Sequence, residues 1–188
     1  PRYRLRANDG AVAWKFFDPY AFGPVLGPLD DWLLVEGQHR RIYERLGAHP
    51  LRHEGVAGTH FAVWAPNARR VSVVGEFNGW DGRHPMRKRV DTGVWEIFLP
   101  GIGEGALYKY EILGADGTLQ PLKADPVGFA GELRPATASR VARTDGFAWT
   151  DDAYMQTRAG RDPRRMPMAI YEVHLGSWRR GPDGRFLT

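Results

Sequence analysis

The sequence predicts a mainly β protein built around one antiparallel β-sandwich. Four short segments in its middle are rich in Val, Ile, Phe, Tyr or Trp, the residue types that fit a pleated, half-buried surface. They are THFAVWA (59–65), VSVVGEF (71–77), GVWEIFLP (93–100) and ALYKYEIL (106–113). Gly, Pro, Asn or Asp bounds each one, as turns between strands require, and the spacing fits a sandwich of about 100 residues. Trp64 and Trp95 lie within two of these segments in alternating patterns, so we expect both in the core.

The composition agrees with a packed domain and argues against several other classes of protein. Of the 188 residues, 43% are hydrophobic and 12% aromatic, which is enough apolar surface for a core. The lack of Cys excludes a disulfide scaffold and a thiolate metal site, and it is compatible with a cytoplasmic location. No apolar run of about eighteen residues occurs, so no membrane helix is expected. Basic residues are interspersed with acidic ones, and even the densest cluster (158–165) contains Asp and Pro, so the net charge of +4 predicts no nucleic-acid partner.

One segment predicts a helix, and another predicts a linker. In LDDWLLVEG (29–37) the side chains of Leu29, Trp32 and Leu33 share one face, and Gly37 is a typical stop signal. The stretch from Phe147 to Pro167 is polar and contains Gly and Pro, which favours an irregular linker to another domain.

An internal repeat lies at the beginning of the chain. The segment YRLRANDGAVAWKFFDPYAF (3–22) aligns without a gap with YEILGADGTLQPLKADPVGF (110–129). The matched pairs, all 107 positions apart, are Tyr3 and Tyr110, Asp9-Gly10 and Asp116-Gly117, Asp18-Pro19 and Asp125-Pro126, and Phe22 and Phe129. Several matches in one register predict that both segments are the closing hairpin and exit loop of similar modules. Residues 1 to about 25 would then be the tail of an earlier sandwich.

The stretch AIYEVHLGSW (169–178) predicts a buried parallel strand that opens a larger α/β domain. Glu172 and His174 would share one face of this strand. They could be functional, because barrel sites collect at the carboxyl ends of strands, but a hydrogen-bonded structural pair is the preferred interpretation. No pair of carboxylates in the chain is placed in a pattern typical of glycosyl transfer, and the six His show no metal-ligand spacing. The sequence therefore predicts no catalytic residue, no cofactor and no metal in this chain.

The best candidate for a binding residue is the aromatic at the end of EFNGW (76–80). An Asn-Gly pair predicts a tight turn after a strand, with Trp80 at its tip. Trp80 is either a flap over the core or a flat platform for the C–H face of a sugar. In the second case, Asn78 and Lys109 could bind the sugar hydroxyls.

Several long motifs together resemble the bacterial glycogen branching enzymes, which are 1,4-α-glucan branching enzymes of the α-amylase superfamily, glycoside hydrolase family 13. The motifs are GTHFAVWAPNARRVSVVGEFNGWDGRHPM (58–86), GVWEIFLPG (93–101), GALYKYEI (105–112), KADP (123–126), RPATASRV (134–141) and IYEVHLGSW (170–178). The resemblance implies an immunoglobulin-like antiparallel β-sandwich, preceded by the tail of a similar module and followed by the first strand of a truncated (β/α)₈ barrel. The implied boundaries are 1–45 for the tail and a connecting helix, 46–145 for a carbohydrate-binding module of family 48, 146–167 for a linker, and 168–188 for the start of the barrel.

The same resemblance implies a function. Enzymes of this family cleave α-1,4 bonds of a glucan and form α-1,6 branches during glycogen biosynthesis. Their catalytic Asp, Glu and Asp lie on the fourth, fifth and seventh barrel strands, which have no counterpart here. The implied partners are an α-glucan (glycogen, amylose or malto-oligosaccharides) and the rest of the barrel. The alternatives are a free-standing glycogen-binding or regulatory module, or a structural sandwich that braces the barrel of a related debranching or trehalose-releasing hydrolase.

Only some glucan-binding residues of related modules have counterparts in this sequence. In the related glycogen-binding modules of AMP-activated kinase β subunits, a Trp and a Lys correspond to Trp80 and Lys109. Their second stacking Trp is replaced by Leu119, and a polar Asn corresponds to Ser139. The resemblance therefore leaves two roles open for this surface, glucan binding and bracing of the barrel.

Overall fold

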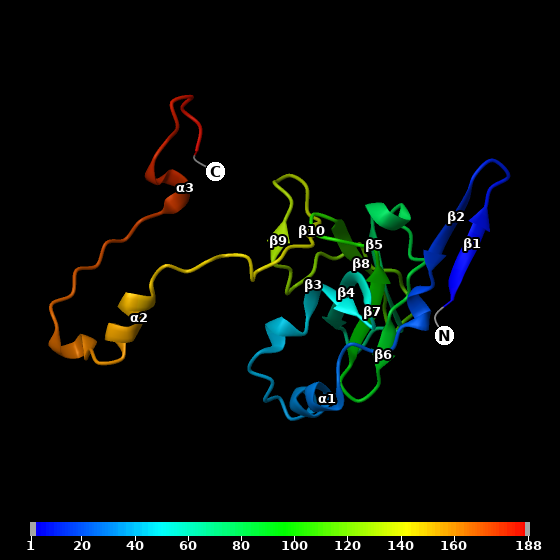
Figure 1. Cartoon of the computed structure of the whole chain (residues 1–188), viewed down its shortest axis with the longest axis horizontal. Helices are drawn as coiled ribbons and strands as arrows, with labels where there is room; N and C mark the ends of the chain where they lie inside the picture. Colours follow the sequence, from blue (N-terminus) through cyan, green and yellow to red (C-terminus); the bar gives the residue numbers. More distant parts are fainter. Residues whose placement is uncertain (1–2, 187–188) are drawn as a thin grey trace. The chain divides into compact units, whose positions relative to one another are not determined.

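The structure is a computed structural model that describes residues 3–186, and the chain divides after Gly146 into two compact units (Figure 1). The first unit contains the expected mainly β architecture, in which all strand pairs are antiparallel. Among the described residues, no helix is long and apolar enough to cross a bilayer.

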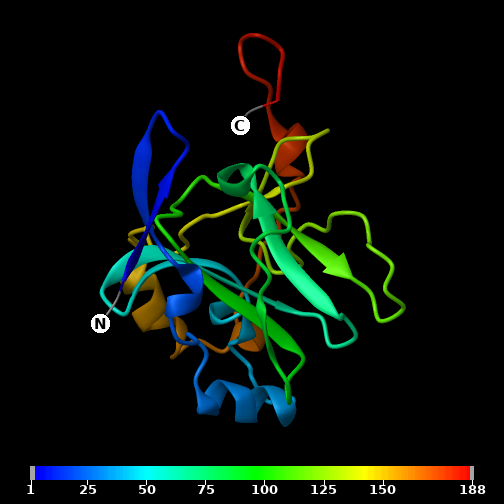
Figure 2. The same ribbon diagram turned by 90° about the vertical axis from the view of Figure 1, so that its right-hand side faces the viewer.

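Two four-stranded sheets form the sandwich (Figure 2). One sheet has the order β3-β4-β7-β6, with β3 at Gly47–His53, β4 at Val56–Trp64, β7 at Val94–Pro100 and β6 at Arg87–Arg89. The other has the order β5-β8-β10-β9, with β5 at Arg70–Gly75, β8 at Leu107–Leu113, β10 at Ser139–Arg140 and β9 at Ala130–Gly131. The four strands predicted from the sequence are thus confirmed as β4, β5, β7 and β8.

The core lies between the sheets and is built by alternate residues of these four strands. Its largest contributors are Phe61, Val63, Val71, Val73, Trp95, Ile97, Leu99, Tyr108 and Tyr110. The prediction for Trp95 is confirmed, because its side chain is 6% exposed. The prediction for Trp64 is wrong: it ends β4 on the opposite face of the strand from Phe61 and Val63, and it is 59% exposed.

The outer face of the first sheet is covered by the chain that precedes it. This chain contains a 3₁₀ turn η1 at Pro19–Ala21, helix α1 at Pro28–Val35 and a second 3₁₀ turn η2 at Ile42–Glu44. Leu26 and Leu46 pack there on Ala62 of β4 and Val94 of β7. The sheet is therefore buried on both sides, which explains why β7 alternates little in exposure along its length.

Helix α1 is present as predicted, but a different side of it packs. Leu29 and Trp32 are 67% and 57% exposed, whereas Leu34 packs on the cluster below the helix. The reason is electrostatic, because Asp31 pairs with Arg89 of β6 and so turns the acidic side of the helix toward the sheet.

A separate two-stranded hairpin precedes this segment. Strands β1 (Arg4–Asn8) and β2 (Ala13–Phe17) pair across a turn at Gly10, and in both views the hairpin, in blue, projects from the sandwich (Figures 1 and 2). The predicted hairpin within residues 3–22 is thus present, with its turn at the expected Asp-Gly pair.

In the second unit, neither the irregular linker expected at residues 147–167 nor the strand expected within residues 169–178 is found as predicted. The predicted irregular linker contains helix α2 at Asp152–Arg158 and a 3₁₀ turn η4 at Pro163–Arg165. Asp152 in the first turn and Arg158 in the last turn of α2 complement the helix dipole, which favours a helix in this polar segment.

The strand predicted within 169–178 is not formed. Residues 169–174 are irregular and are followed by a short helix α3 at Leu175–Trp178, and Ile170 is 84% exposed. A parallel barrel strand needs hydrogen-bonded neighbours on both edges, and the described residues supply none for this segment.

Candidate functional site

Trp80 lies on a tightly fixed turn that leaves β5. The 3₁₀ turn η3 (Glu76–Asn78) ends at Gly79, which is left-handed with φ of +64°. Trp80 itself has φ of +59°, a region that a bulky residue seldom occupies. Its backbone N–H donates to the Gly75 carbonyl over 2.8 Å, which holds this conformation. The indole remains 36% exposed, so it is neither a core residue nor a loose surface side chain.

Asn78 supports this turn from inside and does not face solvent. Its Oδ1 accepts from the Gly75 N–H over 2.9 Å, and its Nδ2 donates to the Val73 carbonyl over 3.0 Å. The same Nδ2 lies 2.9 Å from Nδ1 of His84. At 5% exposure, with its amide fully engaged, Asn78 cannot bind a sugar hydroxyl, so its prediction as a ligand is wrong and its role is to position the turn.

Lys109 lies on the same sheet face as the turn. It is paired in register with Val74 of β5, directly before the start of the turn, and its Nζ donates to Thr137 Oγ1 over 2.7 Å. Gly82 lies so close to Glu111 that a Cβ there would be 2.3 Å from the carboxylate, which places the turn over the outer face of β8. Lys109 and Glu111 are two positions apart on β8 and share that face.

The two remaining predicted residues have different surroundings. Leu119 is 54% exposed and forms a bridge with Leu113 at the end of β8, so an aromatic side chain at its position would reach solvent. Ser139 is 4% exposed, and its Oγ accepts from the Asp125 N–H over 2.9 Å. The prediction of Ser139 as a glucan ligand is therefore wrong, because the hydroxyl is used inside the module.

The structure thus places Lys109 and Glu111 on one face of β8, with Thr137 beside Lys109, and the turn that carries Trp80 passes over this face at Gly82. Sequence reasoning missed Glu111 and Thr137. Glu111 alternates with the buried Tyr110 on β8, and this period-two pattern could have identified it as an outward residue. Thr137 lies in a loop without periodicity, so nothing in the sequence marks it.

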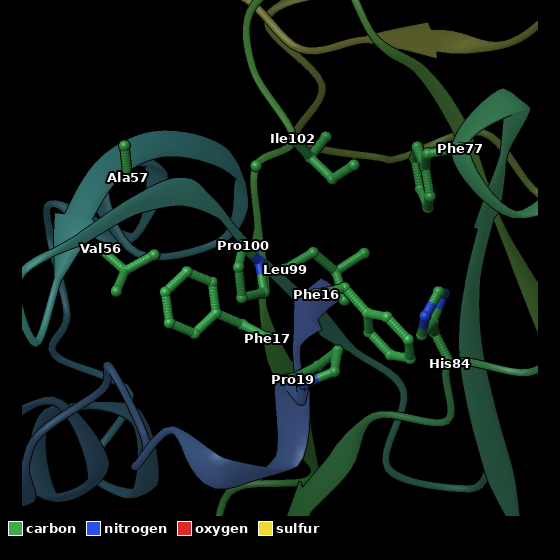
Figure 3. A pocket seen from close by; sticks show the side chains of 11 residues that line it. Phe16, Phe17, Pro19, Val56, Ala57, Phe77, His84, Leu99, Pro100 and Ile102 are labelled. Atoms are coloured by element: carbon green, nitrogen blue, oxygen red, sulfur yellow. The ribbon is translucent and has the colours of Figure 1, made fainter. Parts of the chain in front are cut away.

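An apolar cavity of about 410 Å³ lies between the hairpin and the sandwich (Figure 3). Its lining residues are Phe16, Phe17, Pro19, Val56, Ala57, Phe77, His84, Leu99, Pro100, Gly101 and Ile102. A glucan site needs several hydroxyl-binding groups beside an aromatic platform, and of these side chains only His84 is polar. The chemistry of the cavity therefore does not fit a sugar, and the Trp80 surface is the better candidate.

The described residues contain no group of three or more His, Asp or Glu side chains arranged to hold a metal ion. The Trp80 turn and the face of β8 below it offer an indole, an ammonium group, a hydroxyl and a carboxylate. Such a set can stack on a sugar ring and bind its hydroxyls, but it lacks the paired carboxylates that would cleave a glycosidic bond.

A comparison with protein families defines the class of the sandwich. Residues 45–128 match the family model "Carbohydrate-binding module 48 (Isoamylase N-terminal domain)". The matched range contains both the Trp80 turn and Lys109, and it ends just before Phe129. The class of domain is therefore a carbohydrate-binding module of family 48.

Curated relatives extend the match to nearly the whole chain. The chain is 62% identical to the 1,4-alpha-glucan branching enzyme GlgB of Roseobacter denitrificans over 96% of its own length and 25% of that protein. It is 59% identical to the corresponding enzyme of Rhizobium meliloti over 100% of its own length and 25% of that protein. The chain belongs to the 1,4-α-glucan branching enzyme family and corresponds to the N-terminal region of these enzymes. It spans about a quarter of the length of these relatives.

Among solved structures, a pullulanase from Bacillus acidopullulyticus matches 73% of this chain and 15% of its own, with 22% identity and a TM-score of 0.43.

Proposed function

We propose that this chain binds and positions an α-glucan for a branching enzyme whose catalytic barrel strands lie outside these residues. The observation that carries the proposal is the geometry of Trp80, which is held in a left-handed turn by Gly75 and remains 36% exposed, in a turn that passes at Gly82 over the sheet face of Lys109 and Glu111. The expected ligands are glycogen, amylose and malto-oligosaccharides.

The chemistry of the surface suits a glucan chain. The indole presents a flat apolar face to the C–H groups of one glucose ring, and because its backbone is fixed, little conformational entropy is lost on binding. The Lys109 ammonium and the Glu111 carboxylate lie on the same side of the sheet and offer a donor and an acceptor for hydroxyls.

We further propose that the β1–β2 hairpin is the closing hairpin of a preceding sandwich. Three hydrogen bonds made by Asp9 and Asp18 recur 107 positions later, at Asp116 and Asp125. The face of the hairpin that carries Leu5 and Phe16 would be the inner face of that sandwich, since Leu5 corresponds to Ile112, which packs on the core of the second module. Residues 168–188 would begin the catalytic barrel, with residues 170–175 becoming a strand only beside barrel neighbours.

The cleavage and transfer steps are assigned to residues outside this chain, which offers no paired carboxylates for them. Residues 1–188 should therefore form no new α-1,6 linkages on amylose, as measured by debranching of the product and chain-length analysis. New branches formed by this chain alone would refute the assignment.

Affinity electrophoresis in gels that contain glycogen tests the binding role. We expect retardation by glycogen and none by dextran, whose backbone is α-1,6-linked. The second candidate function, bracing of the barrel, is favoured by Leu119 at the place of an aromatic platform and by the internal use of Ser139. Equal mobility with and without glycogen would support bracing and contradict glucan binding.

A further inference from the structure

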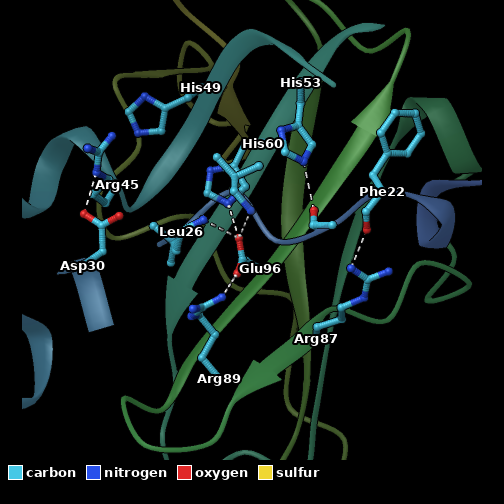
Figure 4. A network of polar contacts seen from close by, with 12 residues as sticks. Phe22, Leu26, Asp30, Arg45, His49, His53, His60, Arg87, Arg89 and Glu96 are labelled. Carbon is cyan, nitrogen blue, oxygen red and sulfur yellow. Dashed lines mark hydrogen bonds and ion pairs between the residues drawn. The ribbon is translucent and has the colours of Figure 1, made fainter. Parts of the chain in front are cut away.

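The joining segment (residues 18–27) crosses the outer face of the β3-β4-β7-β6 sheet, and side chains of that sheet hold its backbone (Figure 4). Arg87 of β6 donates from Nη1 to the Phe22 carbonyl and from Nη2 to the Tyr20 carbonyl, both over 2.6 Å. One guanidinium thus holds two carbonyls of the same segment.

Two neighbouring residues hold the next position of the segment. The Gly23 N–H donates to Glu54 Oε1 over 2.8 Å, and the Gly23 carbonyl lies 3.0 Å from Nε2 of His53. Both backbone polar groups of Gly23 therefore find side-chain partners at the end of β3.

Glu96 of β7 is the centre of this network. Its Oε2 accepts from the N–H groups of Val25 and Leu26 over 2.9 and 3.1 Å, and it lies 3.0 Å from Nε2 of His60. Its Oε1 accepts from Nη1 of Arg89 over 2.6 Å. Glu96 is 2% exposed, and a buried carboxylate is tolerated only with such a set of donors.

The network also reaches the helix and the hairpin. Arg89 donates from Nε to Oδ1 of Asp31 in α1 over 2.6 Å, which ties the far end of the joining segment to the same carboxylate. On the near end, the Phe22 ring packs 5.0 Å from Phe98 of β7 and 6.0 Å from Phe17 of β2. The hairpin is thereby linked to the sandwich through a buried aromatic contact.

We propose that Glu96 is a positioning residue that holds the joining segment on the sandwich, so that the β1–β2 hairpin and the sandwich move as one rigid body in solution. A linker with solvated backbone would let the two parts reorient, whereas here each end and the middle are bonded to one sheet. The orientation of whatever precedes the hairpin is then fixed relative to the Trp80 surface. This inference does not depend on glucan binding.

Distance measurements between two spin labels test the rigidity. The 188 residues contain no Cys, so the substitutions Val12→Cys and Val90→Cys provide two unique label sites within them. Val12 lies at the hairpin tip and is 60% exposed, and Val90 lies between β6 and β7 and is 83% exposed. Pulsed electron–electron double resonance should give one narrow distance peak, and a broad distribution in this parent protein would refute the proposal.

Glu96→Gln should broaden the distribution, because a neutral amide binds the two N–H groups more weakly and places its own N–H₂ toward Arg89. Glu111→Gln is the matched control: it removes a carboxylate that pairs with Arg70 on the other sheet, and it should leave the peak unchanged. A folded Glu96→Gln protein with the parent's narrow peak would contradict the proposal.

A second variant keeps the test decisive if Glu96→Gln fails to fold. Arg87→Met removes only the two carbonyl contacts of the guanidinium, and it should also broaden the peak. An unchanged peak in this variant would then count against the proposal. In Glu96→Gln the amides of Val25 and Leu26 should in addition exchange with deuterium about tenfold faster, as expected when charge-assisted hydrogen bonds weaken.

Discussion

The hydroxyl of Tyr110 donates to Oδ2 of Asp125 over 3.1 Å, and 107 positions earlier the hydroxyl of Tyr3 donates to Asp18 in the same way. The likeness extends to the backbone. Oδ1 of Asp125 accepts from the N–H of Val127, and Oδ1 of Asp18 accepts from the N–H of Tyr20, again 107 positions apart.

The hairpin turns repeat the same correspondence. Oδ1 of Asp116 accepts from the Thr118 N–H over 2.9 Å, and Oδ1 of Asp9 accepts from the Ala11 N–H over 2.9 Å. The glycines that follow, Gly117 and Gly10, both have positive φ, of +83° and +95°. A chance sequence match would not reproduce three hydrogen bonds in one register, so the repeat supports two modules of one kind.

The two Tyr–Asp pairs should nevertheless differ in their contribution to stability. Tyr110 is 1% exposed, so Tyr110→Phe should lower the free energy of unfolding by about 1 kcal/mol through loss of a buried hydrogen bond. Tyr3 is 51% exposed, so Tyr3→Phe should cause no measurable loss. Urea unfolding of the two variants measures both effects, and equal losses would show that the hairpin is packed in solution like the second module.

Trp80→Ala should weaken binding to glycogen by about 1–3 kcal/mol, the scale for one well-packed aromatic contact. The matched control is Trp64→Ala, which removes another exposed indole from the opposite sheet. Affinity electrophoresis at several glycogen concentrations gives both dissociation constants. Equal weakening by the two substitutions, or by neither, would contradict the assignment of Trp80 as the platform.

Leu119→Trp should strengthen glycogen binding, because it adds a second stacking side chain at a position that is 54% exposed. The same gels should show greater retardation than for the parent protein. Leu122→Trp provides a control for non-specific binding by an added indole, since Leu122 is 40% exposed and lies beyond the Asp116 turn. A gain in the control alone would argue against a second platform at 119.

Asn78→Ala should reduce both stability and glucan affinity. The substitution leaves the Gly75 N–H and the Val73 carbonyl without their partner, which costs about 1–3 kcal/mol of unfolding free energy. Trp80 then loses the frame that holds its left-handed backbone. Urea unfolding and glycogen gels run well below the transition measure the two effects separately, with the exposed Asn67→Ala as control. Lower stability with unchanged affinity would show that Asn78 does not position Trp80.

Much of the fold could be predicted because the core strands alternate clearly and are bounded by turn residues. Strand β3 could not, because Pro50 and its polar neighbours do not resemble a strand, and Pro50 is accommodated only because β3 is a sheet edge. The strand expected at Ile170 could not be judged from the sequence alone either. An apolar pattern forms a strand only beside hydrogen-bonded neighbours, and the described residues supply none for this segment.

The candidate site shows a similar limit. The exposure of Trp80 follows from a local signal, the Asn-Gly turn, which acts within a few residues. The internal roles of Asn78 and Ser139 depend on partners that the chain brings near by folding, such as His84 and Asp125. Polar residue types indicate that hydrogen bonds will be made, but not whether their partners are ligand or protein.

Acid should weaken the Glu96 network within a defined pH window. Burial by itself raises the pKa of Glu96, but hydrogen bonds from His60, the Leu26 N–H and Arg89 outweigh this effect and lower it from 4.5 to about 2. Burial also lowers the pKa of His60, so the imidazole is neutral near pH 7 and acts as a hydrogen-bond donor.

Because folding lowers the pKa of the Glu96 carboxyl, the ionised group stabilises the folded protein at pH values above about 4.5, its pKa in the unfolded chain. This stabilisation is lost as the pH falls toward 2 and the carboxyl is protonated. The difference in unfolding free energy between the parent and Glu96→Gln should shrink by on the order of 3 kcal/mol across that window, at about 1.4 kcal/mol per pKa unit. Urea unfolding of both proteins at pH 7, 4.5, 3.5 and 2.5 measures it, and comparison with the variant removes the contribution of other acids such as Asp30. A difference that stays constant from pH 7 to 2.5 would show that Glu96 is not held as an anion by His60 and Arg89.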